Sequence, residues 1–325
     1  MTKNPLVSIA IPLFNVRNYI EKCARSIFEQ SYSNLEYIFV DDCSPDDSVE
    51  ILKKIILQYP SLLSKIKILT HDENMGLFAA RKTAIDSAVG EYLFHVDSDD
   101  YLEYDAIERL VEKSEGGKYD IVLGSFSNIY ANGSTIYRQK DEKCKLVLIS
   151  DIIKRKRPTN IWGNLIRKSL YYNLEIPPIN NGEDYVTMPR LLYNAKFITF
   201  LDVPIYNYTH LNPYAFQFNR DNPKNIKDKI KATDYLFEYF KKNESCTIIM
   251  DSINVSRLLL FAYSIIYANS VSELRSIEKI SIKKKYFSEL KITHRIVVSL
   301  YYLRAYSILL LINRVCMKIK NYGSL

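Results

Sequence analysis

Gly90-Glu91-Tyr92-Leu93-Phe94-His95-Val96 is an apolar segment that predicts a buried strand, and Asp97-Ser98-Asp99-Asp100 follows it directly. Residues i and i+2 of an extended chain point to the same side, so Asp97 and Asp99 are expected to converge on one point. Three carboxylates at the end of an apolar strand are costly unless a cation neutralises them. Carboxylate oxygens suit Mg²⁺ or Mn²⁺, which commonly complete their coordination with phosphate oxygens. The segment therefore predicts a metal-held phosphorylated substrate.

Strands and helices alternate around this segment. Apolar periodicity predicts strands over 7–11, 36–40, 65–69 and 91–96, and helices over 18–30, 49–59 and 77–88. This alternation predicts an α/β fold whose mostly parallel sheet is covered by helices and binds ligands at the carboxyl ends of its strands. A hairpin over 120–138, with Asn132-Gly133 at its turn, makes the expected sheet mixed. Further helices are expected over 226–242, 248–269 and 294–320.

The composition indicates a folded protein of one large domain or two smaller ones. Its 325 residues are 47% hydrophobic, which suffices for a core. Five scattered cysteines without metal-type spacing are expected to be reduced thiols in a cytosolic protein. Residues 1–5 are polar and precede a strand, and no uninterrupted apolar run reaches transmembrane length. Neither a signal peptide nor a membrane span is therefore expected.

The formal net charge of +7 is concentrated near the carboxyl terminus. Residues 283–325 contain nine basic side chains and a single acidic one, Glu289. The apolar residues between these basic groups fit either a helix packed in the core or an amphipathic helix on a membrane surface. We expect residues 283–325 to make peripheral contact with a membrane, and we expect no nucleic-acid partner.

Several motifs along the chain resemble those of family 2 glycosyltransferases. They are Val7-Ser8-Ile9-Ala10-Ile11-Pro12-Leu13-Phe14-Asn15, Val40-Asp41-Asp42-Cys43-Ser44-Pro45-Asp46-Asp47-Ser48, Asn74-Met75-Gly76, Ala80-Arg81, Asp97-Ser98-Asp99-Asp100 and Gly182-Glu183-Asp184. They occur in the family's order and at about its spacing over roughly residues 5–210. The chain departs from the family at Cys43, where these enzymes usually have Gly, and at Lys82, where Asn is common.

The resemblance implies a GT-A fold, a Rossmann-like nucleotide-diphospho-sugar transferase domain. The catalytic domain would span 1–215, and 216–325 would be a helical region that associates with a membrane or a partner. The implied activity is metal-dependent, inverting transfer of a sugar from a nucleotide-diphospho-sugar, preferably a UDP-sugar, to a hydroxyl of a glycan or lipid-linked glycan. It would serve the synthesis of bacterial cell-envelope polysaccharide, in the cytoplasm or on the inner face of the membrane.

The resemblance also assigns residues to the donor nucleotide. Pro12 and Asn15 of the opening motif would contact it, and Asp42 would accept a hydrogen bond from a ring N–H of the base. A carboxylate is acceptor-only, which favours uracil or thymine, although guanine also offers an N–H. Asp41 is also assigned to the nucleotide. The alternative is that Asp41, Asp42 and Ser44 only shape a turn or a helix cap.

The next assigned residues surround the diphosphate and the metal. Arg81 would bind the diphosphate or buttress the loop at Asp97, and the alternative is a surface arginine. Asp99 is the expected metal ligand, while Asp97 would share the metal or, with Ser98, bind the nucleotide. For Asp100, contact with the donor sugar and capping of a helix remain equal alternatives.

The acceptor hydroxyl needs a base. The resemblance assigns Asp184, with Glu183 orienting it or the acceptor, against the alternative of helix capping. A helix N-terminus lowers a carboxyl pKa and neighbouring carboxylates raise it, so the balance at Asp184 stays open. Trp162 is either an acceptor-stacking residue or part of the core. His210 could approach the metal, although a single histidine near a loop usually has no special role.

Two other classes of function stay open. An apolar strand ending in Asp-x-Asp also describes metal-dependent phosphatases of the aspartyl-phosphate type. Those enzymes usually carry the motif on the first strand, whereas here it follows the fourth. A catalytically silent protein that binds nucleotide sugars is the third possibility.

Overall fold

A computed structural model describes residues 4–179, 181–213, 223–243 and 247–313. The chain divides into two compact units, which are described separately below. Unit 1 comprises Met1–Lys145 and Thr159–Ala215, and unit 2 comprises Leu146–Pro158 and Phe216–Leu325.

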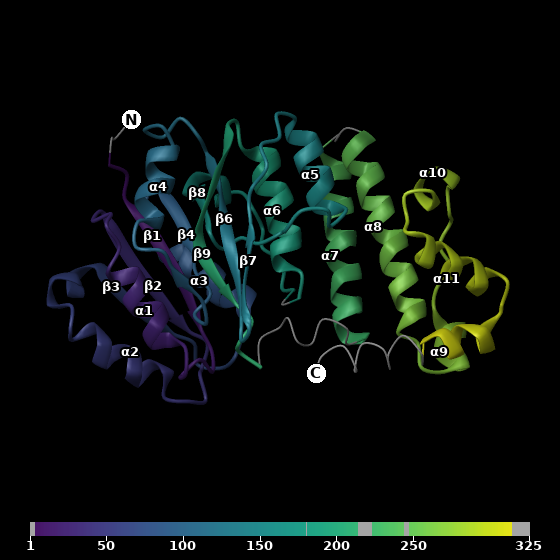
Figure 1. Cartoon of the computed structure of the whole chain (residues 1–325), viewed down its shortest axis with the longest axis horizontal. Helices are drawn as coiled ribbons and strands as arrows, with labels where there is room; N and C mark the ends of the chain where they lie inside the picture. The colour runs from purple at the N-terminus through teal and green to yellow at the C-terminus, as the bar shows by residue number, and fades with distance from the viewer. Residues whose placement is uncertain (1–3, 180, 214–222, 244–246, 314–325) are drawn as a thin grey trace. The chain divides into compact units, whose positions relative to one another are not determined.

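Unit 1 is built on a nine-stranded mixed sheet with the order β3-β2-β1-β4-β8-β6-β9-β5, and β7 pairs with β6 (Figure 1). The strands are β1 (Val7–Leu13), β2 (Leu35–Asp41), β3 (Ile66–Thr70), β4 (Tyr92–His95), β5 (Tyr101–Leu102), β6 (Ile121–Tyr130), β7 (Gly133–Tyr137), β8 (Asn164–Arg167) and β9 (Ile198–Thr209). β1 runs parallel to both β2 and β4, and β8 runs antiparallel to both β4 and β6. The predicted strands, the hairpin and the mixed sheet are therefore confirmed.

Helices cover this sheet and close its core. They are α1 (Ile20–Phe28), α2 (Ser48–Ile56), α3 (Leu77–Ser87), α4 (Ala106–Lys113) and α6 (Glu183–Asn194), with short 3-10 turns η1 (Pro60–Lys65) and η2 (Lys168–Tyr171). The buried residues of α1 recur every three or four positions and place one apolar face on the core. Helix α3 packs against β1 and β2, and α4 packs against β9. The start of α3 lies at the carboxyl edge of the sheet, because the amides of Met75 and Gly76, which precede it, donate to Asp42 just after β2.

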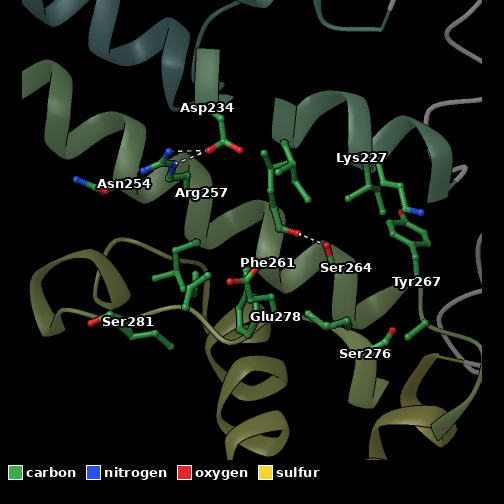
Figure 2. A pocket seen from close by; sticks show the side chains of 18 of the residues that line it. Lys227, Asp234, Asn254, Arg257, Phe261, Ser264, Tyr267, Ser276, Glu278 and Ser281 are labelled. Carbon is green, nitrogen blue, oxygen red and sulfur yellow. Dashed lines mark hydrogen bonds and ion pairs between the residues drawn. The ribbon is translucent and has the colours of Figure 1, made fainter. Parts of the chain in front are cut away.

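Unit 2 is helical. Its elements are α5 (Lys145–Ile153), which begins at the last residue of the first segment of unit 1, α7 (Pro223–Lys242), α8 (Thr247–Ile266), α9 (Val271–Ser276), α10 (Lys284–Phe287) and α11 (Ile292–Tyr302). Helix α8 packs against α7, α10 and α11. A cavity of about 960 Å³ is lined by α7, α8 and residues 276–283, with the Arg257–Asp234 ion pair in its wall (Figure 2).

The carboxyl-terminal region differs from the expected single helix over 294–320. Helix α11 ends at Tyr302, Arg304 has a left-handed φ of 57°, and helical backbone resumes over 306–313. Residues 314–325, which belong to the basic segment, lie outside the described residues. Helix α8 has the length and composition of a membrane span, but 56% of its most apolar window is buried in the protein, so this signal is weak.

Candidate active site

The topology brings the predicted site residues to one edge of the sheet. Since β1, β2 and β4 are parallel, their carboxyl ends face the same side, and register pairs Leu13 with Asp41. The segment after β4, which contains Asp97, leaves the sheet at this edge. Pro12 is buried in β1, and Asn15 follows the strand with a left-handed φ of 56°.

The acidic cluster is anchored to β9. The hydroxyl of Tyr206 accepts a hydrogen bond from the Asp97 amide (3.0 Å) and donates one to Asp100 (2.7 Å). The Thr209 amide donates to the second Asp100 oxygen (2.7 Å), and the Asp100 side chain is almost fully buried. Asp100 therefore fastens the loop to β9. It does not cap the next helix, because the N-cap of α4 is Asp105, and its contact with the donor sugar stays a prediction.

Asp99 is a partly buried carboxylate of the same loop. Its Oδ2 accepts a hydrogen bond from Asn212 Nδ2 (2.9 Å), and its carbonyl accepts one from Thr209 Oγ1 (2.8 Å). Burial, followed by the charge of Asp97, raises the pKa of Asp99 to about 6. Across the described residues, no Lys, Arg or His forms an ion pair with it. A divalent cation would relieve this unfavourable charge, so the donor set fits a hard metal ion.

Two carboxylates, those of Asp97 and Asp99, are available for such an ion. Within the described ranges, no group of three or more His, Cys, Asp or Glu side chains is arranged to hold a metal ion. Mg²⁺ is commonly bound through one or two carboxylates together with substrate phosphates, so two carboxylates are compatible with such an ion.

Arg81 connects the acidic cluster to the start of α6. Its guanidinium is 2% exposed and binds Asp97 (2.8 Å), Asp184 and Glu183. A buried charge of this kind requires partners, and here one guanidinium serves three carboxylates. Arg81 is therefore a buried residue with three carboxylate partners, and the alternative of a surface arginine is wrong. Its contact with Asp97 corresponds to the predicted buttress.

Glu183 and Asp184 occupy the first turn of α6. Gly182 precedes them with a φ of 115°, and no side chain caps the helix there. Burial raises the pKa of the Asp184 carboxyl and outweighs the lowering effect of Arg81, while Glu183 adds to the increase. The balance left open by the sequence thus favours a raised pKa, which suits a base.

Asp42 belongs to a separate network at the end of β2. Its carboxylate accepts hydrogen bonds from the amides of Met75 (2.9 Å) and Gly76 (2.7 Å) and lies 2.7 Å from His71 Nδ1. It thereby holds the loop that opens α3, the helix that carries Arg81. A carboxylate offers about four acceptor positions, so capacity remains for a ligand N–H.

Asp41 and Cys43 shape the neighbouring turn. The Asp41 side chain accepts a hydrogen bond from the Ser44 amide (3.0 Å), which is the predicted turn role. Cys43 has a left-handed φ of 57°, a conformation that glycine adopts most easily. This explains why the resemblance implies Gly at that position. Ser98 is buried beside the acidic cluster.

Aromatic side chains gather at the end of β9. Two of them, Trp162 and His210, were candidates from the sequence, whereas Tyr130, Tyr206 and Tyr208 were not assigned to the site. Trp162 is 6% exposed and stacks on Tyr206 and Tyr208, so it belongs to the core. His210 stacks on Tyr130 with ring centroids 4.4 Å apart. The alternation Tyr206-x-Tyr208-x-His210 places these rings on one face of the strand, and this spacing was the available signal.

Together, Asp97, Arg81, Glu183 and Asp184 form one buried array, and Asp99 adjoins it through the Asp97 loop. Asp42 and Asp41 lie at the end of another strand of the same edge. The structure thus has polar groups at the ends of β1 and β2, followed by carboxylates after β4 and at the start of α6. Such an arrangement can bind an anion through a metal and accept a proton nearby.

Comparisons with known proteins show the family and the fold of the chain. The family model described as Glycosyl transferase family 2 matches residues 8–174. An uncharacterized glycosyltransferase of Haemophilus influenzae is 36% identical over 268 residues, which cover 80% of this chain and 96% of that protein. Glycosyltransferase GlyA of Streptococcus pneumoniae is 28% identical over 214 residues, which cover 62% of this chain but only 30% of GlyA.

Among solved structures, S. aureus TarS 1–349 in complex with UDP superposes with a TM-score of 0.60 at 18% identity. The match covers 96% of this chain and 91% of that structure. At this identity the likeness establishes a common fold.

Proposed function

The chain belongs to glycosyl transferase family 2 and has the GT-A fold, and from this premise we propose the reaction that it catalyses. It transfers a hexosyl or N-acetylhexosaminyl group from a nucleotide-diphospho-sugar, preferably a UDP-sugar, to a hydroxyl of a glycan or lipid-linked glycan, with inversion. The observation that carries the proposal is the buried array in which Arg81 joins Asp97 to Asp184. It supports a donor site at Asp97 and a base for the acceptor hydroxyl at Asp184, because one guanidinium contacts both carboxylates.

The donor nucleotide lies over β1 and β2 in this proposal. Asp42 accepts the ring N–H of the base, and Pro12, Asn15 and Asp41 line the nucleotide position. An imide N–H matches an acceptor-only carboxylate, which favours uracil. TarS, whose fold this chain shares, is crystallised with UDP, and this agrees with a UDP-sugar donor.

Asp99 and Asp97 would hold Mn²⁺ or Mg²⁺, with Ser98 beside them. When bound, the ion supplies positive charge to the leaving diphosphate. Arg81 keeps Asp97 oriented toward that position and offsets part of the carboxylate charge. The support for the metal is the Asp99 carboxylate, which is partly buried, has a raised pKa and forms no ion pair among the described residues.

Asp184 is the proposed base. Its raised pKa lets it take the proton of the acceptor hydroxyl while that oxygen attacks the anomeric carbon. The bond from that carbon to the diphosphate breaks on the opposite side, which inverts the configuration. Glu183 orients Asp184 through their common partner Arg81.

Cellular context is part of the same proposal. The enzyme acts in the cytoplasm on cell-envelope polysaccharide, with residues 1–215 as catalytic domain and 216–325 as a helical region. Residues 283–325 contact the inner face of the membrane. Exposed Ile292 and Ile296 on α11, and Leu303 directly after it, support this contact, because their spacing puts them on one side of the helix.

The proposal is tested with a panel of UDP-, dTDP- and GDP-sugars, each incubated with and without Mn²⁺. We expect UDP release from at least one UDP-sugar, dependent on the metal. Hydrolysis of p-nitrophenyl phosphate without nucleotide-sugar turnover would support a phosphatase. Nucleotide-sugar binding, measured as a rise in unfolding temperature, without any turnover would support a silent binding protein.

A further inference from the structure

A row of aromatic rings runs along the end of β9 at the same edge as the acidic cluster. Tyr206, Tyr208 and His210 alternate along the chain, and Trp162 stacks on the first two with centroids 4.5 and 4.7 Å apart. His210 continues the pairing with β6, because its amide donates to the Ile129 carbonyl (2.8 Å). The row ends at Tyr130, whose ring stacks on His210 at an angle of 19°.

Topology places this end of the row beside the proposed metal position. β8 is antiparallel to both β4 and β6, so β6 runs parallel to β4, and β9 is parallel to β6. Tyr130 and His210 therefore leave the sheet at the same edge as Asp97. His210 also lies between Thr209 and Asn212, which both hydrogen-bond to Asp99.

The row lies away from the proposed nucleotide position. In the sheet order, β1, β4 and β8 separate β2 from β6. With neighbouring strands about 4.8 Å apart, β2 and β6 are about 19 Å from each other. A nucleobase at Asp42 would not reach Tyr130, so the ring is available to a different substrate.

The Tyr130 ring has the properties of a sugar platform. It is 40% exposed although His210 covers one of its faces, so solvent reaches the remaining surface. His210 is in turn held by a contact to Asn128 Oδ1 (3.1 Å), which fixes the orientation of the stack. A pyranose ring presents C–H groups on its face and hydroxyls at its edge, which matches a rigid aromatic surface next to polar groups.

We propose that Tyr130, backed by His210, is the platform on which a pyranose ring of the acceptor stacks. This inference rests on the proposed glycosyl transfer and identifies the acceptor as a carbohydrate at this position, with its attacking hydroxyl directed toward the carboxylates. Trp162, the aromatic residue that the sequence offered for this role, instead supports the row from within the core.

Saturation-transfer difference NMR with the methyl glycosides of glucose, galactose, mannose, N-acetylglucosamine and rhamnose tests the proposal. We expect at least one glycoside to bind wild type through its ring C–H protons. Tyr130→Ala should weaken that binding by about tenfold or more, and Tyr130→Trp should retain it. The matched control is Tyr104→Ala, which removes a 69% exposed tyrosine and should bind as wild type. Tyr104 also lies close to β9, because the amide of the preceding residue, Glu103, donates to the carbonyl of Ile205, five residues before His210.

Equal sugar binding by wild type and Tyr130→Ala would overturn the platform, as would the absence of binding by every glycoside. The unfolding temperature of each variant is measured in parallel, and Tyr130→Trp guards against a folding defect in the alanine variant. UDP release from UDP-N-acetylglucosamine by wild type is recorded separately. If that release persists while the sugar results fail, only the platform is wrong. If no nucleotide sugar of the panel is turned over, the proposed function is wrong. The effect of Tyr130→Ala on glycoside binding then still shows whether Tyr130 binds a pyranose ring.

Discussion

At the scale of single residues, Arg81 holds the candidate site together. Its guanidinium is the shared partner of Asp97, Glu183 and Asp184, and its Nε has no hydrogen-bond partner among the described residues. Removing it would leave three carboxylates close together in a poorly hydrated position, where charge is costly. The same arrangement explains how a carboxylate pair on α6 is kept next to a loop that follows β4.

Arg81→Met is therefore expected to lower the free energy of unfolding by about 3–5 kcal/mol, the usual cost of breaking a buried ion pair. Urea denaturation at pH 7 measures this value. Lys82→Met is the matched control, because Lys82 is the next residue of α3 and forms an exposed pair with Asp86. Similar stability of the two variants would show that the guanidinium does not neutralise the array.

Asp184→Asn keeps the shape of the side chain but cannot accept a proton. We expect kcat to fall by about 10²–10⁴-fold while donor affinity changes little, because the proposed base acts in the chemical step and the Asn oxygen can still accept a hydrogen bond from Arg81. Steady-state kinetics together with UDP titration separate these two effects. A variant that keeps its turnover would move the base elsewhere, and Glu183 would be the next candidate.

At the scale of elements, the turn between α3 and β4 fixes the strand that carries the acidic cluster. The Gly90 amide donates to Ser8 Oγ (2.9 Å) and to Glu36 Oε1 (3.1 Å), which ties the turn to β1 and β2. A Cβ atom at position 90 would lie 2.5 Å from Ser8 Oγ and 2.8 Å from the Leu6 carbonyl oxygen. Backbone atoms on this side leave little room for adjustment.

Gly90→Ala should therefore destabilise unit 1 by about 1–3 kcal/mol, the typical cost of overpacking. The change is measured by urea denaturation against Val89→Ala, since Val89 is the neighbouring residue and is 68% exposed. A stability equal to that of the control would mean that the turn tolerates a side chain and does not define the approach of β4.

The elements that depend on local periodicity were predictable from the sequence, and those that depend on distant partners were not. The 3.6-residue spacing of α1 and the Asn132-Gly133 turn predict their elements directly. The break at Arg304 was missed because the apolar pattern continues through it. The motifs single out Asp97, Arg81 and Asp184. That both carboxylates bind the Arg81 guanidinium depends on the packing of α3 and α6, which no motif contains. The roles of Tyr206 and Asp100 require the pairing of β9, which no local pattern contains.

At the scale of the whole molecule, unit 2 combines a packed core with an exposed apolar row. Val297, Val298 and Tyr301 of α11 are buried in the unit, whereas Ile292 and Leu303 are 71% and 75% exposed. Deleting the basic segment would remove core residues, so surface variants test membrane contact more cleanly than truncation does.

The variant Ile292→Ser/Ile296→Ser/Leu303→Ser is expected to lose most of its binding to anionic vesicles. Wild type should bind phosphatidylglycerol vesicles in co-sedimentation and release them at high salt, because basic groups near the apolar row contribute about 1 kcal/mol each. Leu57→Ser/Leu63→Ser, which alters exposed leucines of unit 1, should bind as wild type. If wild type does not bind anionic vesicles, the membrane contact is wrong and α11 has a structural role only.

The central claim is that the partly buried carboxylates of Asp97 and Asp99 bind a nucleotide diphosphate through a divalent cation. Calorimetric titration of UDP with Mn²⁺ present, or with EDTA in its place, tests it most directly on wild type, Asp99→Asn and the exposed control Asp86→Asn. The account predicts metal-dependent UDP binding by wild type and Asp86→Asn, and its loss in Asp99→Asn with an unchanged unfolding temperature in the absence of metal. UDP binding that is equally strong in EDTA, or that survives in Asp99→Asn, would contradict it.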